Sequence, residues 1–304
     1  MIRNIHKPRM DRVTKSCLAL SAALIALCVT SCGSSGELTS AVGEQTATYR
    51  VVDLDTGAST YRTEVPDLAD NPEYRDRLLV LRHIPAHQTT IGAQPSDEFA
   101  DADERTPRSV AIRELYIAVF ELTRSQWQRL ARGQVSGQSS ISAQPWADLG
   151  ITDGANDHPA TGMSQSVSET VLDSWGKARG LQVALPTEEE WEDAARAGGG
   201  IYPFDPANLT DVGRFARVRE TLSTAITTDS GTSPVGRRSP NGWNLYDMAG
   251  NAAELTATID ADEQAHVHGG SWSDPVAATR ASNASTLPPF AGHQLVGVRV
   301  VVRP

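Results

Sequence analysis

Cysteine is scarce in this sequence: there are three in 304 residues, and the last of them is Cys32. Residues 33–304 therefore have no thiol, so neither a disulfide nor thiolate chemistry is available to them. An oxidising compartment would allow disulfide bridges, but here the stability of the fold must come from a buried core. A stretch of roughly 270 residues is long enough to bury one.

Positive charge is scarce too, with 27 Lys and Arg against 37 Asp and Glu and a formal net charge of −10. Residues 1–31 contain five basic side chains and one acidic one, which leaves a charge of −14 on the remainder. An acidic surface repels phosphate backbones and anionic headgroups, so we expect neither nucleic acid nor direct contact with a membrane surface as a partner. The sequence has no Walker-type or dinucleotide-binding glycine loop, so we expect no nucleotide either.

The apolar run Cys17–Val29 is shorter than the roughly 20 residues that span a bilayer. Basic residues precede it and small residues end it, as in an export signal. It closes with Val29-Thr30-Ser31-Cys32, which resembles a bacterial lipobox. By that resemblance residues 1–31 are a lipoprotein signal peptide and an acylated Cys32 anchors the protein in a membrane. An ordinary secretory signal with incidental cysteines is the alternative.

The lipoprotein interpretation predicts a lipid-anchored protein of a bacterial cell envelope. Gly33 rather than Asp follows Cys32, which favours the outer membrane, on the periplasmic or the surface face. Residues 32–48 begin with a Gly/Ser stretch and are expected to form a flexible tether.

Two further regions follow the tether. In residues 49–77, the β-rich runs Tyr49–Leu54 and Ser59–Val65 flank a glycine-containing turn and predict a β-hairpin extension with a connector. The pattern at Leu78–Ala86 is typical of a buried strand, so we place the main domain at 78–304.

Helices are expected at three places. Thr123 is a typical N-cap for an amphipathic helix over Arg124–Arg132. A second helix runs from Ser168 and is closed by Gly180. The third begins after Thr187, which forms the S/T-x-x-E capping box with the glutamate three positions later.

The start of the third helix carries three adjacent carboxylates, Glu188, Glu189 and Glu190. Adjacent side chains point about 100° apart on a helix, so they do not converge easily on a metal or a substrate. We expect them to stabilise the helix start through the capping box and the helix dipole.

Three segments occur in a characteristic order: LPTEEEWEDAARAGG at Leu185–Gly199, NGWNLYDMAGNAAE at Asn241–Glu254 and HGGSW at His268–Trp272. Together they resemble the sulfatase-modifying-factor family of formylglycine-generating-enzyme-like domains, and weaker matches extend from about Leu78 to the C-terminus. The resemblance implies an α+β fold: an irregular, loop-rich, duplicated C-type-lectin-like fold with short helices and small antiparallel sheets. Members of that family include protein-modifying oxidases, other redox enzymes, ligand-binding variants and non-catalytic modules.

Asp247 and Glu254 are seven residues apart, on either side of a Gly-Asn turn that can aim carbonyl groups inward. Calcium prefers six to eight oxygen ligands, which such a loop can supply. The resemblance implies a structural calcium ion held by the side chains of Asp247 and Glu254 and the carbonyl groups of Gly250 and Ala252. The alternative is a metal-free turn in which Glu254 bonds to backbone. By the same resemblance, Arg299 is expected to be a structural ion-pair residue.

Aerobic formylglycine-generating members carry two copper-binding cysteines after the Gly-Gly-Ser-Trp segment. This chain has Ser273–Thr279 there, without a cysteine. Copper(I) selects thiolate, and a serine hydroxyl stays protonated near neutral pH, so we expect neither copper nor formylglycine-generating activity. Ser271, His268 and Asp274 lie close in sequence, but closeness in sequence does not indicate a catalytic triad.

His266 and His268 alternate, and on a strand both imidazoles would lie on one face. Asp274 or His293 could complete a histidine–carboxylate site of the non-haem iron type. This gives an alternative function, a metal-dependent oxidoreductase or protein-modifying enzyme. Ordinary strand-face histidines are the simpler interpretation.

The C-terminal third is also expected to carry a ligand surface, because aromatic, arginine and amide side chains in a loop-rich region recognise peptides, proteins or glycans. The candidate residues are Trp272, Ser273, Asp274, Arg280, Asn283, Phe290 and His293. The same residues could instead serve packing and solvated loops. The sequence thus favours a calcium-stabilised binding module, with the metal-dependent enzyme as the alternative and an envelope scaffold as a third possibility.

Overall fold

The computed structural model describes residues 48–304 except 94, 96, 98, 101–106, 133–134, 137–138, 153, 198–215 and 219–230. The expected signal peptide, the acylation site Cys32 and most of the tether lie outside the described residues. The described residues belong to one compact unit. Across the described part of the chain, no helix combines the length and the apolar character needed to cross a bilayer.

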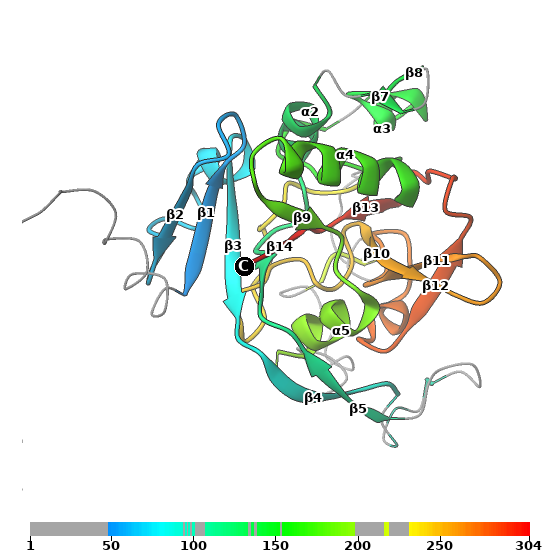
Figure 1. Ribbon diagram of the computed structural model, residues 1–304. Helices are drawn as coiled ribbons and strands as arrows, with labels where there is room; N and C mark the ends of the chain where they lie inside the picture. Colours follow the sequence, from blue (N-terminus) through cyan, green and yellow to red (C-terminus); the bar gives the residue numbers. More distant parts are fainter. Residues whose placement is uncertain are drawn as a thin grey trace, which may run out of the picture. The chain divides into compact units, whose positions relative to one another are not determined.

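A six-stranded antiparallel sheet forms the centre of this unit (Figure 1). Its strands, in spatial order, are β2 (Ser59–Arg62), β1 (Tyr49–Asp53), β3 (Leu78–Ile84), β6 (Leu115–Ala118), β14 (Val301–Arg303) and β9 (Gln182–Ala184). The predicted hairpin is therefore present, and β1 pairs with β3 along its whole length. The extension at 49–77 continues the sheet of the main domain.

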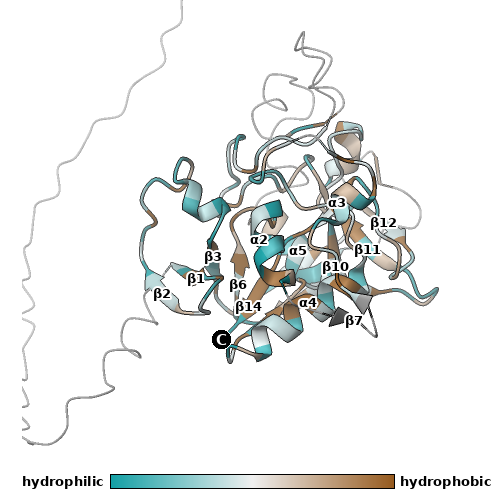
Figure 2. Ribbon diagram, turned by 90° about the horizontal axis from the view of Figure 1, so that it is seen from above, coloured by the Kyte–Doolittle hydropathy of each residue, from teal (hydrophilic) through white to brown (hydrophobic). Residues whose placement is uncertain are grey.

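Side chains alternate between the two faces of the central strands, as the pleat of a strand requires. Tyr116 and Val302 point into a core with α2 (Arg124–Ala131) and α4 (Gln165–Lys177). Their neighbours Ile117 and Val301 point into a second core with α5 (Glu188–Arg196). Figure 2 shows the resulting apolar strands between more polar helix surfaces.

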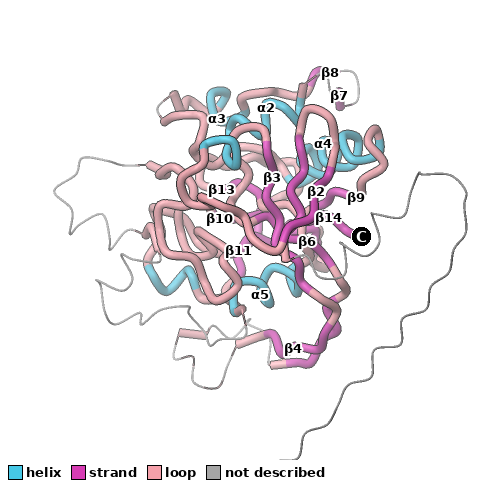
Figure 3. Tube along the Cα trace, turned by 90° about the vertical axis from the view of Figure 1, so that its left-hand side faces the viewer, coloured by secondary structure: helices cyan, strands magenta, loops and turns pink. Residues whose placement is uncertain are grey.

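A second sheet supports the C-terminal third. Its order is β12 (Ala284–Leu287), β11 (Ala265–His268), β10 (Ala253–Ile259) and β13 (Val296–Val298), and the pair of β10 and β13 is parallel. Across β10 and β11, Glu254 lies opposite His268. Long loops gather beside this sheet, as Figure 3 shows. The site candidates expected from the sequence lie in its strands β10 and β11 or in the loops and turns around them.

Shorter elements complete the described fold. They are the two-stranded sheets β4 (His87–Ile91) with β5 (Arg108–Ile112) and β7 (Val135–Ser136) with β8 (Ser139–Ser140), the helix α3 (Pro145–Asp148), and the 3-10 turns η1 (Pro72–Arg75) and η2 (Val276–Thr279).

The expected fold class is confirmed: the short helices and several small sheets form a mixed α+β domain. The Thr123 cap of α2 is present as a capping box. So is the Thr187 box of α5, in which Glu190 N donates to Thr187 Oγ1 at 3.2 Å and Thr187 N donates to Glu190 Oε2 at 2.9 Å. Helix α4 begins one turn before the expected Ser168, because Ser164 accepts a hydrogen bond from Val167 N and caps it.

Candidate functional site

The predicted calcium segment Asp247–Glu254 contributes to a buried group of charged side chains, which we call the acidic cluster. Its members are all buried: Glu121, Asp247, Glu254 and Arg299. Arg299 Nη2 and Nε donate to the two oxygens of Glu254 at 2.7 and 2.9 Å. Trp191 Nε1 also donates to Glu254 Oε2, at 2.6 Å. Arg299 is thus the buried ion-pair residue that the sequence predicts.

Glu121 and Asp247 hold the loop from the other side. Glu121 accepts from Ala252 N at 2.8 Å and from Asn251 Nδ2 at 2.6 Å. Asp247 Oδ2 accepts from Gly236 N at 2.6 Å. The loop requires glycine at Gly250, where φ is 77° and an added Cβ would lie 2.1 Å from a backbone oxygen.

Burial and mutual repulsion disturb the ionisation of this cluster. Burial raises the pKa of Glu121 well above its ordinary value, and the charges of Asp247 and Glu254 raise it further. Burial likewise raises the pKa of Asp247 to about 6, although the Gly236 hydrogen bond and Arg299 oppose the rise. With every group ionised, three carboxylates face one guanidinium, and this local charge of −2 is costly in a buried place.

The charge of the acidic cluster fits a divalent cation, since a +2 ion would balance it. The positions of the ligand candidates fit in part. Asp247 and Glu254 lie in the same cluster, but both oxygens of Glu254 accept hydrogen bonds from Arg299. An ion sharing Glu254 would compete with these bonds, so Asp247 and the carbonyl groups of Gly250 and Ala252 would carry more of the ligation.

A second group of possible metal ligands lies at the junction of α5 and β11, and we call it the histidine–glutamate cluster. One ligand atom each from Glu188, His266 and His268 lies within 4.8 Å of the other two. His266 Nδ1 is 3.1 Å from Glu188 Oε2, and His268 Nε2 is 4.0 Å from Glu188 Oε1. Over the described ranges, no other three histidine, cysteine or acidic residues meet in this way.

The carboxylate in this cluster differs from the candidates taken from the sequence, which were Asp274 and His293. Asp274 instead closes the Gly-Gly-Ser-Trp turn, where its Oδ2 accepts from Ser271 N at 2.9 Å and from Ser271 Oγ at 2.6 Å. His293 is exposed and accepts a hydrogen bond from Leu295 N. The structure brings neither residue to the two histidines.

The expected ligand surface is divided among separate places. Arg280 is buried, donating to Asp97 Oδ2 at 2.8 Å and to Asn283 Oδ1 at 3.1 Å. Ser273 N donates to the Ser271 hydroxyl within the turn, at 3.3 Å. Arg280 and Asn283 therefore serve an internal polar contact, whereas Trp272 and Phe290 line two separate cavities.

Trp272 lines a cavity of about 360 Å³, here called the tryptophan cavity. Arg124 and His158 line it as well, and His158 Nδ1 lies 3.0 Å from Thr232 Oγ1. Phe290, 83% exposed, lies away from it and lines a different hollow of about 370 Å³.

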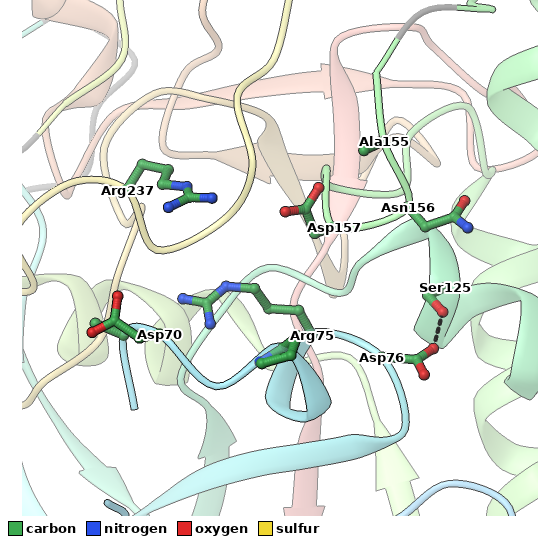
Figure 4. Close-up of a pocket in the computed structure, with 10 residues that line it drawn as sticks. Asp70, Arg75, Asp76, Ser125, Ala155, Asn156, Asp157 and Arg237 are labelled. Atoms are coloured by element: carbon green, nitrogen blue, oxygen red, sulfur yellow. Dashed lines mark hydrogen bonds between the residues drawn. The ribbon is translucent and has the colours of Figure 1, made fainter. Parts of the chain in front are cut away.

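A cavity of about 600 Å³ is lined in part by residues 155–157, and we call it the arginine cavity. In Figure 4 the guanidinium groups of Arg75 and Arg237 and the carboxylates of Asp70 and Asp157 surround a common space. Burial and the neighbouring Arg237 lower the pKa of Arg75. Loop 154–158 supplies residues to both cavities, so the two lie next to each other.

Some residues of these sites were not expected from the sequence. Glu121 had a usable signal, because it interrupts an apolar run that includes Val119, Phe120 and Leu122. Glu188 had one as well, since it lies three positions before Trp191 and so shares its inward face of α5. Asp97 stands in a polar loop and had no such signal.

Comparison with known proteins identifies the family that the chain resembles. Residues 74–304 match the family model of the sulfatase-modifying factor enzyme 1-like domain. The chain is 38% identical over 133 residues to the inactive C-alpha-formylglycine-generating enzyme 2 of Bos taurus, covering 38% of this chain and 42% of that protein. It is 37% identical over 117 residues to the formylglycine-generating enzyme of Thermomonospora curvata, covering 35% of each. The chain thus spans less than half the length of these curated relatives.

Solved structures share the fold. PvdO from Pseudomonas aeruginosa superposes with a TM-score of 0.62 at 20% identity, covering 74% of this chain and 95% of that one. Variable protein 1 of Treponema denticola gives a TM-score of 0.58 at 17% identity, covering 75% and 96%. At these identities the similarity concerns the fold alone.

Proposed function

The chain belongs to the sulfatase-modifying factor enzyme 1-like domain family, and we propose that it is a member that binds a polypeptide ligand without generating formylglycine. The absence of any cysteine from residues 33–304 carries the second half of this proposal. Copper(I) requires soft thiolate ligands, which Ser273 cannot replace. One relative that matches part of the chain supports this half of the proposal, because it is named an inactive formylglycine-generating enzyme.

The two adjacent cavities support the binding half of the proposal. The tryptophan cavity offers an aromatic ring beside Arg124 and His158, and the arginine cavity offers both guanidinium and carboxylate groups. Aromatic and arginine side chains in concave sites are frequent anchors of protein ligands. A polypeptide presents apolar side chains together with charges of both signs, which this pair of cavities would complement.

We extend the proposal to calcium at the acidic cluster. The excess of negative charge in this cluster supports the binding of a divalent cation. The groups that would hold the ion are Asp247, Gly250, Ala252 and Glu254. Its role would be structural, because the surrounding loop has little regular secondary structure and buried carboxylates repel one another without a counter-ion.

The proposed setting is a bacterial cell envelope, with the domain anchored through an acylated Cys32 on a tether. The support is the sequence of the first 36 residues. Metabolic labelling with a fatty-acid analogue tests it: label should enter the wild-type chain and be lost in Cys32→Ser.

The first experiment on function separates binding from catalysis. The full chain is incubated with copper, a thiol reductant, oxygen and a sulfatase-type cysteine peptide, and the peptide is analysed by mass spectrometry. We expect an unchanged cysteine. An aldehyde in its place would overturn the proposal.

The second experiment tests the cavities. Peptides selected from a displayed random library against the full chain are titrated, by fluorescence polarisation, into wild type, Trp272→Ala, Arg237→Ala and the control Phe290→Ala. If the loss of an anchoring side chain costs more than about 1.4 kcal/mol of binding free energy, the affinity falls at least tenfold. We expect that loss in Trp272→Ala or Arg237→Ala, with Phe290→Ala unchanged. Equal affinity for all four proteins would contradict the assignment of the site.

A further inference from the structure

We propose that Glu188, His266 and His268 form a binding site for a divalent transition-metal ion of the zinc or iron(II) class. Two imidazoles with one carboxylate are a donor set that such ions prefer, whereas calcium prefers oxygen ligands alone. The site is distinct from the acidic cluster and from both cavities, and it does not depend on the proposed peptide binding.

The backbone brings the three ligands together from two elements. His266 and His268 are two residues apart on β11, so their side chains lie on the same face of the strand. Glu188 is the first residue of α5, and its N–H donates to Thr258 Oγ1 of β10 at 3.0 Å. The helix start is therefore fixed against the sheet that carries the histidines.

The donor atoms converge on one space. Glu188 Oε2 is 3.1 Å from His266 Nδ1, and Glu188 Oε1 is 4.0 Å from His268 Nε2. Atoms that share a metal at about 2.0 to 2.2 Å lie somewhat over 3 Å apart in a tetrahedral site. The two separations from Glu188 span that value, and all three donor atoms lie within 4.8 Å of one another, so side-chain rotations would bring them to tetrahedral spacing around an ion.

Neighbouring groups lie against both imidazoles. Asp260 Oδ2 lies 3.7 Å from His266 Nε2, the ring nitrogen that faces away from Glu188. Backbone N–H groups of Asp262 and Gln264 hold this carboxylate at 2.9 and 2.8 Å. A carboxylate behind the non-ligating nitrogen is the usual support of a metal-binding histidine. The ring of His268 stacks on Trp191 with centroids 5.0 Å apart.

Burial favours a structural role for the ion. The side chains of His268 and Glu188 are 0% and 6% exposed, and that of His266 is 12% exposed. A metal here would tie the first turn of α5 to β11 with little access for a substrate. A direct contact between the His266 ring and Glu188 would also explain the 3.1 Å separation without a metal. The two cases predict different zinc binding.

The test uses the full chain without a polyhistidine tag, stripped of metals and then saturated with calcium. Zinc is titrated calorimetrically into wild type, Glu188→Gln and His266→Gln. The three cysteines of the chain are common to all three proteins, so the site is measured as the difference between them. We expect the wild type to bind one more equivalent, or to bind it at least about a hundredfold more tightly, because each variant removes a direct ligand.

Two controls make the result specific. His83→Gln removes a histidine of another carboxylate pair, in which Nε2 lies 2.8 Å from Glu114 Oε1, and should leave zinc binding unchanged. Asp260→Asn should keep the stoichiometry but weaken binding about 10- to 100-fold. Cobalt(II) substituted for zinc should show histidine-ligated d–d absorption in wild type that is absent from Glu188→Gln. Equal zinc stoichiometry and affinity in wild type, Glu188→Gln and His266→Gln would overturn the proposal.

Discussion

At the scale of single residues, Arg299 offsets much of the negative charge in the acidic cluster. Its guanidinium forms two short contacts with Glu254 and also donates to Ala118 O at 2.9 Å and to Tyr246 O at 2.8 Å. These bonds join β6, β10 and the loop before Asp247. A buried charge with this many partners is costly to remove, because each partner is left without compensation.

Arg299→Met should therefore lower the free energy of unfolding by about 3–5 kcal/mol, as expected when one member of a buried ion pair is removed. Urea denaturation followed by circular dichroism measures it. The matched control is Arg108→Met, which removes an arginine whose pair with Glu189 is half-exposed on both sides and should cost only about 0–1 kcal/mol. Similar losses in the two variants would argue against a special role for the cluster.

Asp247 should give the stability of the calcium-free protein an unusual pH dependence. Its pKa in the folded state, about 6, is above the ordinary value of 3.8 for an aspartate. The proton therefore binds the folded state more tightly, so this contribution to stability is fully present below about 3.8 and is lost as pH rises through about 6. Glu121 acts in the same direction.

Melting temperatures measured with a calcium chelator should consequently rise between pH 7 and pH 5 in wild type, and rise less in Asp247→Asn. The comparison with the variant is needed because the pKa of His87 is also raised, despite burial, by its contacts with Pro85 and Asp193, and this too adds stability towards low pH. Parallel pH profiles for the two proteins would show that Asp247 does not titrate as inferred.

At the scale of elements, α5 contacts both clusters. Glu188 belongs to the histidine–glutamate cluster, and Trp191 donates a hydrogen bond to Glu254 of the acidic cluster. Glu188 faces the histidines, Glu189 pairs with Arg108 at 2.6 Å, and Glu190 pairs with Arg303 at 2.6 Å. The three carboxylates diverge as helix geometry requires. They do not converge with one another, as expected, but Glu188 lies beside histidines from another element.

Thr187→Ala should remove the capping box of α5 and cost about 1 kcal/mol of stability, within a range of about 0.5–2. Thr63→Ala, at an exposed loop position, is the control and should change stability by less than about 0.5 kcal/mol. If the helix start also positions Glu188, zinc affinity should fall in Thr187→Ala while it stays unchanged in Thr63→Ala.

Local sequence signals predict much of the fold because they act over a few residues. The caps at Thr123 and Thr187 and the hairpin after Tyr49 are present as expected. The buried strand expected at Leu78–Ala86 is present as Leu78–Ile84, two residues shorter, with Pro85 and Ala86 exposed. The start of α4 lies one turn before the expected Ser168, because apolar spacing marks the inward face of a helix and not its first residue, which Ser164 caps.

The candidate sites were harder to predict, because their members come from distant parts of the chain. Arg280 looks available for ligand binding in the sequence, because its buried partner Asp97 is 183 positions away. Glu188 is likewise 78 positions from His266, and periodicity gives no information on which carboxylate a strand will face. Such pairings depend on topology, which single-sequence patterns constrain only weakly.

At the scale of the whole molecule, calcium should act as a stabilising ligand if it binds the acidic cluster. A ligand that binds only the folded state raises the unfolding free energy by about 2.7 kcal/mol at a hundred times its Kd. Calcium should therefore raise the melting temperature at pH 7. It should do so less at pH 5, where the raised pKa values of Asp247 and Glu121 leave more protons to displace.

Differential scanning calorimetry with and without excess calcium, reversed by a selective chelator, measures this effect. Magnesium at the same concentration is the control for ionic strength. If the melting temperature is the same with and without calcium at both pH values, the metal-free turn is favoured. The cluster would then be kept partly protonated instead of bound to an ion.

Glu254 and His268 face each other across β10 and β11, and the indole of Trp191 both donates to Glu254 and stacks on His268. The two proposed ions would therefore share neighbours and exert a mutual coupling free energy. Such coupling is reciprocal: whatever factor calcium imposes on zinc affinity, zinc must impose on calcium affinity. In such a domain, the affinity for one metal would depend on whether the other metal is bound.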